Sequence, residues 1–310
     1  MSPSFSVHPL ETGVAPTWAS AWGEDVHGPW AAIELGAVEV RLRWIPGGTF
    51  WMGSPEGEAG RWGEDHETDN WSSYDEGPRH QVRLSEGFWI CQTPCTQEAW
   101  EEVMGSNPSE FVSPTRPVEK VSWQDCQDFL TRLNQRIEGL DARLPTEAQW
   151  ERACRGGTED ATFAGDLEIL GRCNAPLLDD IAWYSGNSGV AFELDNGLDT
   201  TTIEQWIEKQ HEFTRAGTHP VGCKQANPYG LHDVLGNVLE WCADPAREYD
   251  SELAVDPEGS PGGAGWRGSL RALRGGSWGV RARLCRAAAR CANAPEGRIV
   301  VIGFRWSRGQ

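Results

Sequence analysis

The first part of the chain alternates between apolar and polar positions in two short runs. Residues 32–35 and residues 38–44 both follow this period of two. Such alternation is typical of strands that bury one face. The two runs therefore predict a β-hairpin at the beginning of a folded domain, followed by a turn at residues 45–48.

Three segments carry the signals of helices. Residues 96–104 form a short one, and in residues 122–137 apolar side chains recur three and four positions apart, which places them on one helix face. A third helix is predicted after Pro145, because Thr146 and Gln149 have the spacing of a capping box. Beyond about residue 157, Gly, Asn, Pro and Trp interrupt the apolar segments, so we expect loops and short strands.

The composition favours a globular protein rich in turns. The 310 residues include 36 glycines and 17 tryptophans, and 39% are hydrophobic, which excludes a disordered chain and a helical bundle. With 46 acidic and 27 basic residues the net charge is −19, so phosphate backbones and anionic lipids would repel the chain. We expect neither a nucleic-acid nor a membrane partner. No apolar run has the length of a signal sequence or membrane span, which predicts a cytoplasmic protein.

The nine cysteines are scattered and odd in number. They lack the paired C-x2-C spacing of zinc sites, so we expect buried free thiols. They lie at positions 91, 95, 126, 154, 173, 223, 242, 285 and 291.

Charge is distributed unevenly along the chain. Residues 267–310 contain ten arginines and one acid, Glu296, a net charge of +9. Because guanidinium groups bridge loops well, we expect several of them to point inward onto carboxylates and carbonyls. A site for an anion or a nucleic acid is the alternative interpretation.

Seven segments, in this order along the chain, resemble the formylglycine-generating enzyme (sulfatase-modifying factor) family. They are residues 45–54, 76–82, 117–123, 143–151, 227–241, 274–278 and 303–305. The resemblance implies the family's C-type-lectin-like fold, an α+β fold with little regular secondary structure. It also implies a single domain at residues 30–308, preceded by an N-terminal extension of residues 1–29.

The family's chemistry depends on residues that this sequence does not carry in full. The resemblance implies oxidation of a substrate cysteine by copper held between two cysteines in C-x4-C spacing, since thiolates suit Cu(I). Val280 stands at the position of the first cysteine, and Cys285 with Cys291 has C-x5-C spacing instead. This favours a non-catalytic protein that requires no cofactor. The alternative is a formylglycine-generating-type oxidase that uses Cys285 and Cys291 unconventionally.

Residues 274–306, which we call the tail, resemble the variable proteins of diversity-generating retroelements. In those proteins the stretch from Gly-Gly-Ser-Trp to Gly-Phe-Arg forms a ligand-binding surface on a fixed lectin-like scaffold. In the tail, scaffold-type residues are interleaved with residues that share no structural pattern. The resemblance therefore implies ligand-binding positions at Trp278, Gly279, Val280, Arg281, Leu284, Ala289, Cys291, Ala292, Asn293, Gly297, Ile299, Val300 and Val301.

Five of these positions are aliphatic. If exposed, they would form an apolar patch for a protein or other ligand. They are Val280, Leu284, Ile299, Val300 and Val301. The alternative is that residues 299–301, three β-branched residues in a row, form a buried strand.

The family resemblance also implies one possible metal site. Residues 230–240 resemble the family's calcium loop, in which carboxylates and backbone carbonyls surround a structural ion. The ligands here would be the side chains of Asp233 and Glu240 and the carbonyls of Gly236 and Val238. The alternative is that Asp233 caps a turn and Glu240 pairs with a C-terminal arginine.

The sequence thus predicts a non-catalytic ligand-binding protein that resembles the variable proteins. A third interpretation, a subunit of a larger complex, rests on the tryptophan-rich residues 17–30 as a docking segment.

Overall fold

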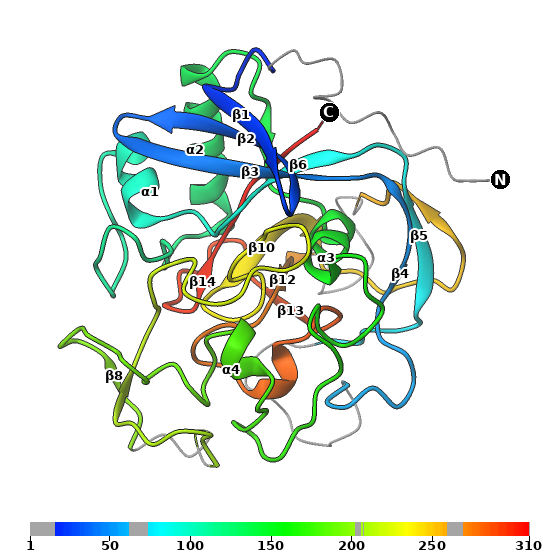
Figure 1. Ribbon diagram of the computed structural model, residues 1–310, viewed down its shortest axis with the longest axis vertical. Helices are drawn as coiled ribbons and strands as arrows, with labels where there is room; N and C mark the ends of the chain where they lie inside the picture. Colours follow the sequence, from blue (N-terminus) through cyan, green and yellow to red (C-terminus); the bar gives the residue numbers. More distant parts are fainter. Residues whose placement is uncertain (1–15, 62–73, 202–205, 207, 259–268, 310) are drawn as a thin grey trace.

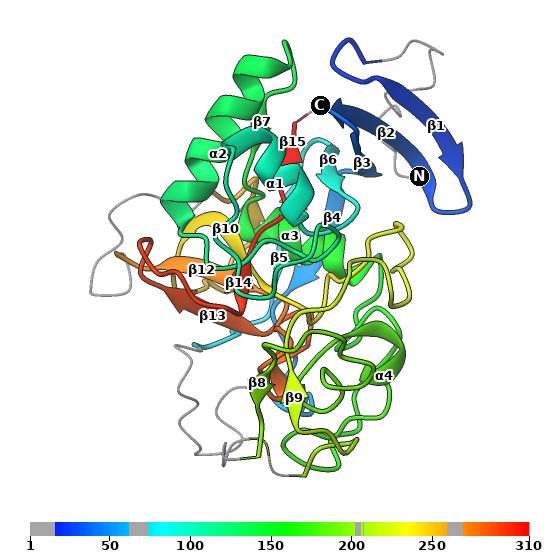
Figure 2. The same ribbon diagram turned by 90° about the vertical axis from the view of Figure 1, so that its left-hand side faces the viewer.

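The largest sheet joins strands from both ends of the described chain. The computed structural model describes residues 16–61, 74–201, 206, 208–258 and 269–309. Six strands pair in the order β1-β2-β3-β6-β15-β7; Figure 1 labels β1, β2, β3 and β6, and Figure 2 also labels β15 and β7. Their bounds are Ala21–Asp25 (β1), Gly28–Leu35 (β2), Val38–Ile45 (β3), Phe88–Cys91 (β6), Ser307–Arg308 (β15) and Ala142–Arg143 (β7). Strand β15 is antiparallel to both β6 and β7, so it lies inside the sheet.

The predicted hairpin is confirmed as β2 and β3, which pair from Trp30 opposite Arg43 to Leu35 opposite Val38. Residues 21–25, which the sequence assigned to an N-terminal extension, form β1, and this strand pairs with β2 across a turn in the same sheet. Trp18, part of the proposed docking segment, is buried and packs at 5.9 Å against Trp89. Residues 21–25 lack the alternation that marks β2 and β3, which is why the sequence did not predict this strand.

Three smaller sheets complete the β structure (Figure 2). The four-stranded sheet has the order β13-β12-β10-β14, with bounds Arg290–Asn293 (β13), Arg271–Arg274 (β12), Leu239–Pro245 (β10) and Ile302–Gly303 (β14). A three-stranded sheet contains Ala254–Val255 (β11), His80–Leu84 (β5) and Gly48–Met52 (β4). The last pair is Leu198–Asp199 (β8) with Arg215–Ala216 (β9). The tail thus supplies β13 and β14 to the four-stranded sheet.

The three predicted helices are present. They are Gln97–Met104 (α1), Trp123–Arg136 (α2) and Glu147–Arg155 (α3), with two further short turns at Leu178–Ile181 (α4) and Ala282–Leu284 (η3). The capping box of Thr146 and Gln149 is confirmed, and Ser122 forms a second one with Asp125. Helices α1 and α2 pack together, whereas α3 packs on β4, β10 and β12. Helix α3 therefore links the four-stranded sheet, which contains strands of the tail, to the three-stranded sheet.

The long region after α3 is dominated by loops, as predicted. Apart from α4 and the short strands β8 and β9, residues 157–235 form no α-helix or strand in the part of the chain that the structure describes. Eight of the nine cysteines are buried free thiols and Cys223 is exposed. No helix among the described residues has the length and apolarity needed to cross a membrane. The observed class is α+β in one domain, as expected.

Candidate ligand-binding region

Buried arginines of the tail anchor it to the scaffold. Arg286 donates to Glu58 at 2.5 Å and to Glu76 at 2.6 Å, although these carboxylates lie more than 200 residues away in sequence. Arg290 donates to both oxygens of Glu147, at 2.7 and 2.8 Å. The predicted inward orientation of several arginines is thus confirmed, and these guanidinium groups are held as structural parts.

The charge of Glu147 depends on these arginines. Burial alone would raise the pKa of its carboxyl, but Arg290 and Arg274 outweigh that effect and lower the pKa to about 2. Arg274 also pairs with Glu151. This cluster of buried charges lies between α3 and β12 and β13 of the four-stranded sheet. It fixes the position of the backbone at both ends of residues 274–290.

Arg305 donates hydrogen bonds to residues of the predicted calcium loop. Arg305 donates to both oxygens of Glu240, with a shortest distance of 2.7 Å, and Trp150 Nε1 donates to Glu240 Oε2 at 2.7 Å. Arg305 also donates to the backbone carbonyl of Asp233. Its guanidinium therefore supplies the positive charge that the calcium ion would have supplied.

The other proposed calcium ligand is also engaged by protein donors. The Asp233 carboxylate accepts the Gly222 N–H at 2.7 Å and the Asn237 side-chain amide at 3.1 Å. No group of three or more metal-ligating side chains converges among the described residues. Both carboxylates are thus engaged by protein donors, whereas calcium needs several oxygens free to face the ion. The alternative interpretation of Glu240, a pairing with a C-terminal arginine, is confirmed.

The thiol chemistry that copper needs is not accessible at the tail. Val280, at the position of the first copper cysteine, is buried, and its carbonyl accepts the Ser185 N–H at 3.1 Å. Burial raises the pKa of the Cys285 thiol to about 12, so this sulfur is protonated at neutral pH. Because a thiolate, not a thiol, is the metal ligand, Cys285 is poorly suited to bind Cu(I).

The predicted binding positions divide into two groups. Buried members are Trp278, Val280, Leu284, Ala289, Cys291, Ala292 and Val301, whereas partly exposed members are Gly279, Arg281, Asn293, Gly297, Ile299 and Val300. The expected apolar patch of five aliphatic side chains is therefore wrong, since three of the five are buried. Residues distant in sequence cover Trp278, because the rings of Phe111 and Trp206 pack on it with centroid distances of 5.2 and 5.8 Å.

Residues 299–301 are held by their backbone. The carbonyl of Ile299 accepts the Lys120 N–H at 3.2 Å, and the carbonyl of Val300 accepts the Trp278 indole at 2.9 Å. The carbonyl of Val301 accepts the Leu239 N–H at 2.8 Å. These residues form a turn rather than the alternative buried strand, and only the Val301 side chain is buried. The side chains of Ile299 and Val300 remain partly exposed on a fixed backbone.

Four of the predicted binding positions are apolar and partly exposed, and we call them the tail strip: Gly279, Gly297, Ile299 and Val300. A Cβ atom on Gly279 would lie 3.2 Å from the Val301 side chain, so this glycine is adjacent to the 299–301 turn. Gly297 lies beside Asn293 in the same way.

Two ion pairs flank the strip. Lys120 Nζ lies 3.0 Å from Glu110, and Arg298 Nε lies 2.7 Å from Asp125. Sequence reasoning missed these four residues, because only the fold brings Glu110 and Asp125 beside the tail. An apolar centre with a charged rim is the arrangement of a protein-binding surface.

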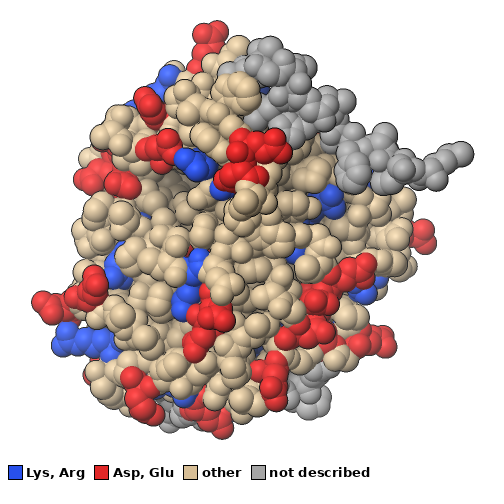
Figure 3. Space-filling model, in the orientation of Figure 1, with Lys and Arg blue, Asp and Glu red and all other residues tan. Residues whose placement is uncertain are grey.

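The face in Figure 3 carries many acidic side chains. Lys and Arg side chains lie singly or in small groups among them rather than in one stripe, as far as the described residues show. Phosphate backbones are bound by clustered basic side chains. The expectation of no nucleic-acid partner stays a prediction that this distribution favours.

Residues 39–309 match the Sulfatase-modifying factor enzyme 1-like domain. The chain belongs to the sulfatase-modifying factor family. Among characterised members, the formylglycine-generating enzyme of Thermomonospora curvata is 33% identical over 218 residues, 66% of this chain and 60% of that protein. The chaperone protein LppX of Paenibacillus barcinonensis is 31% identical over 197 residues, 52% of this chain and 63% of that protein. The chain thus spans less than two thirds of the length of these relatives.

The likeness to a solved structure extends over nearly the whole chain. The structure of Treponema denticola variable protein 1 superimposes with a TM-score of 0.66 at 26% identity, covering 91% of this chain and 99% of that one. The predicted fold of the formylglycine-generating-enzyme type is therefore confirmed. The sulfatase-modifying factor fold carries an enzyme, a chaperone and a variable protein by name, so the site has to decide the function of each member.

Proposed function

We propose that this chain is a non-catalytic binding protein that contacts a protein or other ligand through the tail strip. The observation that carries the proposal is the buried Val280 at the position of the first copper cysteine. Burial keeps the Cys285 thiol protonated, and a protonated sulfur is neither a good Cu(I) ligand nor a reactive nucleophile. The likeness to a variable protein supports the binding role.

The tail strip suits this role because its backbone and its side chains have separate tasks. Three successive carbonyls hold residues 299–301 against Lys120, Trp278 and Leu239. Side chains on such a backbone contribute little to folding and can change with the ligand. The nine free cysteines suit a reducing compartment, so we place this binding protein in the cytoplasm.

Copper binding provides the sharpest test of the non-catalytic part. The reduced protein is titrated with Cu(I) against a competing chelator, and oxygen consumption is followed with a thiol peptide as substrate. We expect no stoichiometric copper binding and no oxygen consumption. The Val280→Cys variant, which restores the C-x4-C spacing with Cys285, serves as the matched control for a reconstructed pair. One equivalent of tightly bound Cu(I) in the unmodified chain, lost in Cys285→Ser, would overturn the proposal.

A display experiment tests the binding part. One library randomises Gly279, Gly297, Ile299 and Val300, and a matched library randomises four exposed aliphatic positions elsewhere: Val112, Leu170, Val190 and Leu253. Both are selected against immobilised lysozyme as the test protein. We expect equal display levels and binders from the tail-strip library alone. Loss of display in that library, or equal yields of binders from both, contradicts the proposal.

A further inference from the structure

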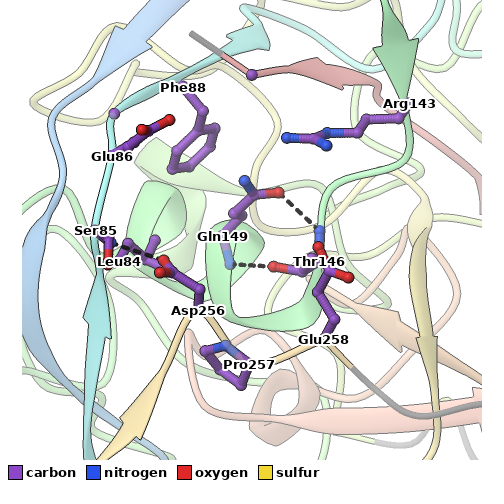
Figure 4. Close-up of a pocket in the computed structure, with 12 residues that line it drawn as sticks. Leu84, Ser85, Glu86, Phe88, Arg143, Thr146, Gln149, Asp256, Pro257 and Glu258 are labelled. Atoms are coloured by element: carbon purple, nitrogen blue, oxygen red, sulfur yellow. Dashed lines mark hydrogen bonds between the residues drawn. The ribbon is translucent and has the colours of Figure 1, made fainter.

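A cavity of about 240 Å³ lies away from the tail strip. It is bounded by the connection between β5 and β6, by β7, by the start of α3 and by the segment that follows β11 (Figure 4). None of the tail residues 274–306 lines it. At about 30 Å³ for each water molecule, the cavity holds roughly eight waters, the size of a small metabolite.

One side of the cavity presents hydrogen-bond donors. The guanidinium of Arg143 points into it, and no described residue accepts a hydrogen bond from this group or forms an ion pair with it. Gln149 uses its Oε1 to accept the Thr146 N–H at 3.0 Å. Its Nε2 is then free to donate, and Figure 4 shows it directed into the space between Phe88 and Arg143. These donors suit a carboxylate, which an arginine binds in a bidentate manner.

The opposite side presents acceptors. The carboxylate of Glu86 points toward Arg143 across the Phe88 ring (Figure 4). Asp256 lies below it and accepts the Ser85 N–H at 2.7 Å through one oxygen, and Glu258 lines the same cavity. With three carboxylates and one guanidinium, the walls carry a net negative charge. A ligand that matches both sides has one anionic group and more than one cationic group.

We infer that this cavity binds a basic α-amino acid, such as lysine or ornithine. The ligand carboxylate would lie against Arg143 and Gln149, and the ammonium groups against Glu86 and Asp256. Leu84 and Phe88 form the apolar floor beneath the aliphatic part of the ligand. This inference is independent of the tail strip, because the two surfaces share no residue.

Calorimetric titration of the intact chain with L-lysine tests the inference. We expect binding of one equivalent. Cadaverine lacks the carboxylate and 6-aminohexanoate lacks the α-ammonium group, so each should bind at least tenfold more weakly. No heat of binding with L-lysine at millimolar concentration overturns the inference. Cadaverine binding as tightly as L-lysine also overturns it, because the arginine side would then take no part.

Two variants locate the site. Arg143→Gln and Glu86→Gln remove one charge on each side, and both side chains are exposed, so the melting temperature should hold. We expect each to weaken L-lysine binding about tenfold or more. Arg132→Gln and Glu138→Gln, exposed residues outside the cavity, are the matched controls and should leave the affinity unchanged. Equal affinity in all four variants would place the amino acid elsewhere and refute the inference.

Discussion

The two halves of the tail are attached to the same scaffold in opposite ways. In residues 282–292 the side chains point inward, and the guanidinium groups of Arg286 and Arg290 form ion pairs with buried carboxylates. In residues 299–301 the backbone makes the attachment, because its carbonyls accept hydrogen bonds from Lys120 and Leu239 of the scaffold and from the Trp278 indole. Both halves are well fixed, but only the second leaves its side chains at the surface.

This difference separates stability from recognition within one segment. A segment held by its side chains loses its attachment when they change, because a buried carboxylate or a cavity is left behind. A segment held by its carbonyls keeps every hydrogen bond whatever its side chains are. A surface that must accept many sequences is therefore best built from the second kind.

We expect the largest effect on stability from replacing an arginine whose side chain points into the scaffold. Arg286→Met leaves Glu58 and Glu76 buried without their cation, and we expect a loss of about 3–5 kcal/mol in the free energy of unfolding. Arg298→Met removes an arginine from the other half, where the side chain is 53% exposed, and should cost at most about 1 kcal/mol. Urea unfolding of both variants measures the contrast. Equal losses would abolish the distinction between the halves.

We expect the second-largest loss of stability from a cavity made within residues 282–292. Leu284 is 4% exposed, and Leu284→Ala is expected to cost about 2–5 kcal/mol, the range for buried leucines. Its melting curve is compared with that of Val112→Ala, where the side chain is exposed and little should change. A melting temperature equal to that of the unmodified chain would mean that Leu284 faces solvent after all.

The stability of the region that packs on Trp278 should depend on pH. Glu119 accepts the backbone N–H groups of Glu110 and Phe111, and the Phe111 ring packs on Trp278. Burial raises the pKa of the Glu119 carboxyl from 4.5 to about 7. Between these values the folded chain holds a proton that the unfolded chain has released, so stability falls as pH rises through this window.

Glu119→Gln removes this dependence. Relative to the unmodified chain, the variant should gain up to about 3 kcal/mol between pH 4.5 and pH 8, at about 1.4 kcal/mol for each pKa unit. Burial also lowers the pKa of His219 from 6.5 to about 4, which weakens the fold as pH drops below 6.5. Both proteins contain His219, so its contribution cancels in the difference. A difference that does not vary with pH contradicts the raised pKa of Glu119.

The smallest change is expected on the tail strip itself. Ile299→Ser and Val300→Ser should alter the free energy of unfolding by about 1 kcal/mol or less, since both side chains are partly exposed and both carbonyls keep their donors. Chemical unfolding at one pH is sufficient to check this. A loss as large as that of Leu284→Ala would show that the strip is part of the core.

Local patterns predicted the elements whose signals are local. The stripe in residues 122–137 and the Thr146 and Gln149 box identified α2 and α3, because caps and helical periodicity act within a few residues. The excess of arginines predicted inward guanidinium groups, but it could not say which carboxylate meets which. Arg286 and Glu58 are 228 residues apart, a pairing that only the folded topology decides.

The candidate surface was predictable only in part for the same reason. Val280, Leu284 and Val301 are aliphatic, as an apolar binding patch requires, but all three are buried. The Ser185 N–H binds the Val280 carbonyl, and Trp206 packs beside Trp278. The mosaic of the tail indicated the segment in which we propose the binding surface. It could not reveal which of its residues other loops would cover.

The position of β15 has a consequence for how such a protein is made. Residues 307–308 lie between β6 and β7, so the six-stranded sheet cannot close during synthesis until translation has passed the whole tail. A stop codon anywhere in residues 274–306 removes this strand, whereas a replacement of the partly exposed side chains of Ile299 or Val300 leaves it in place. An intact reading frame through the tail is therefore a condition for completing the six-stranded sheet.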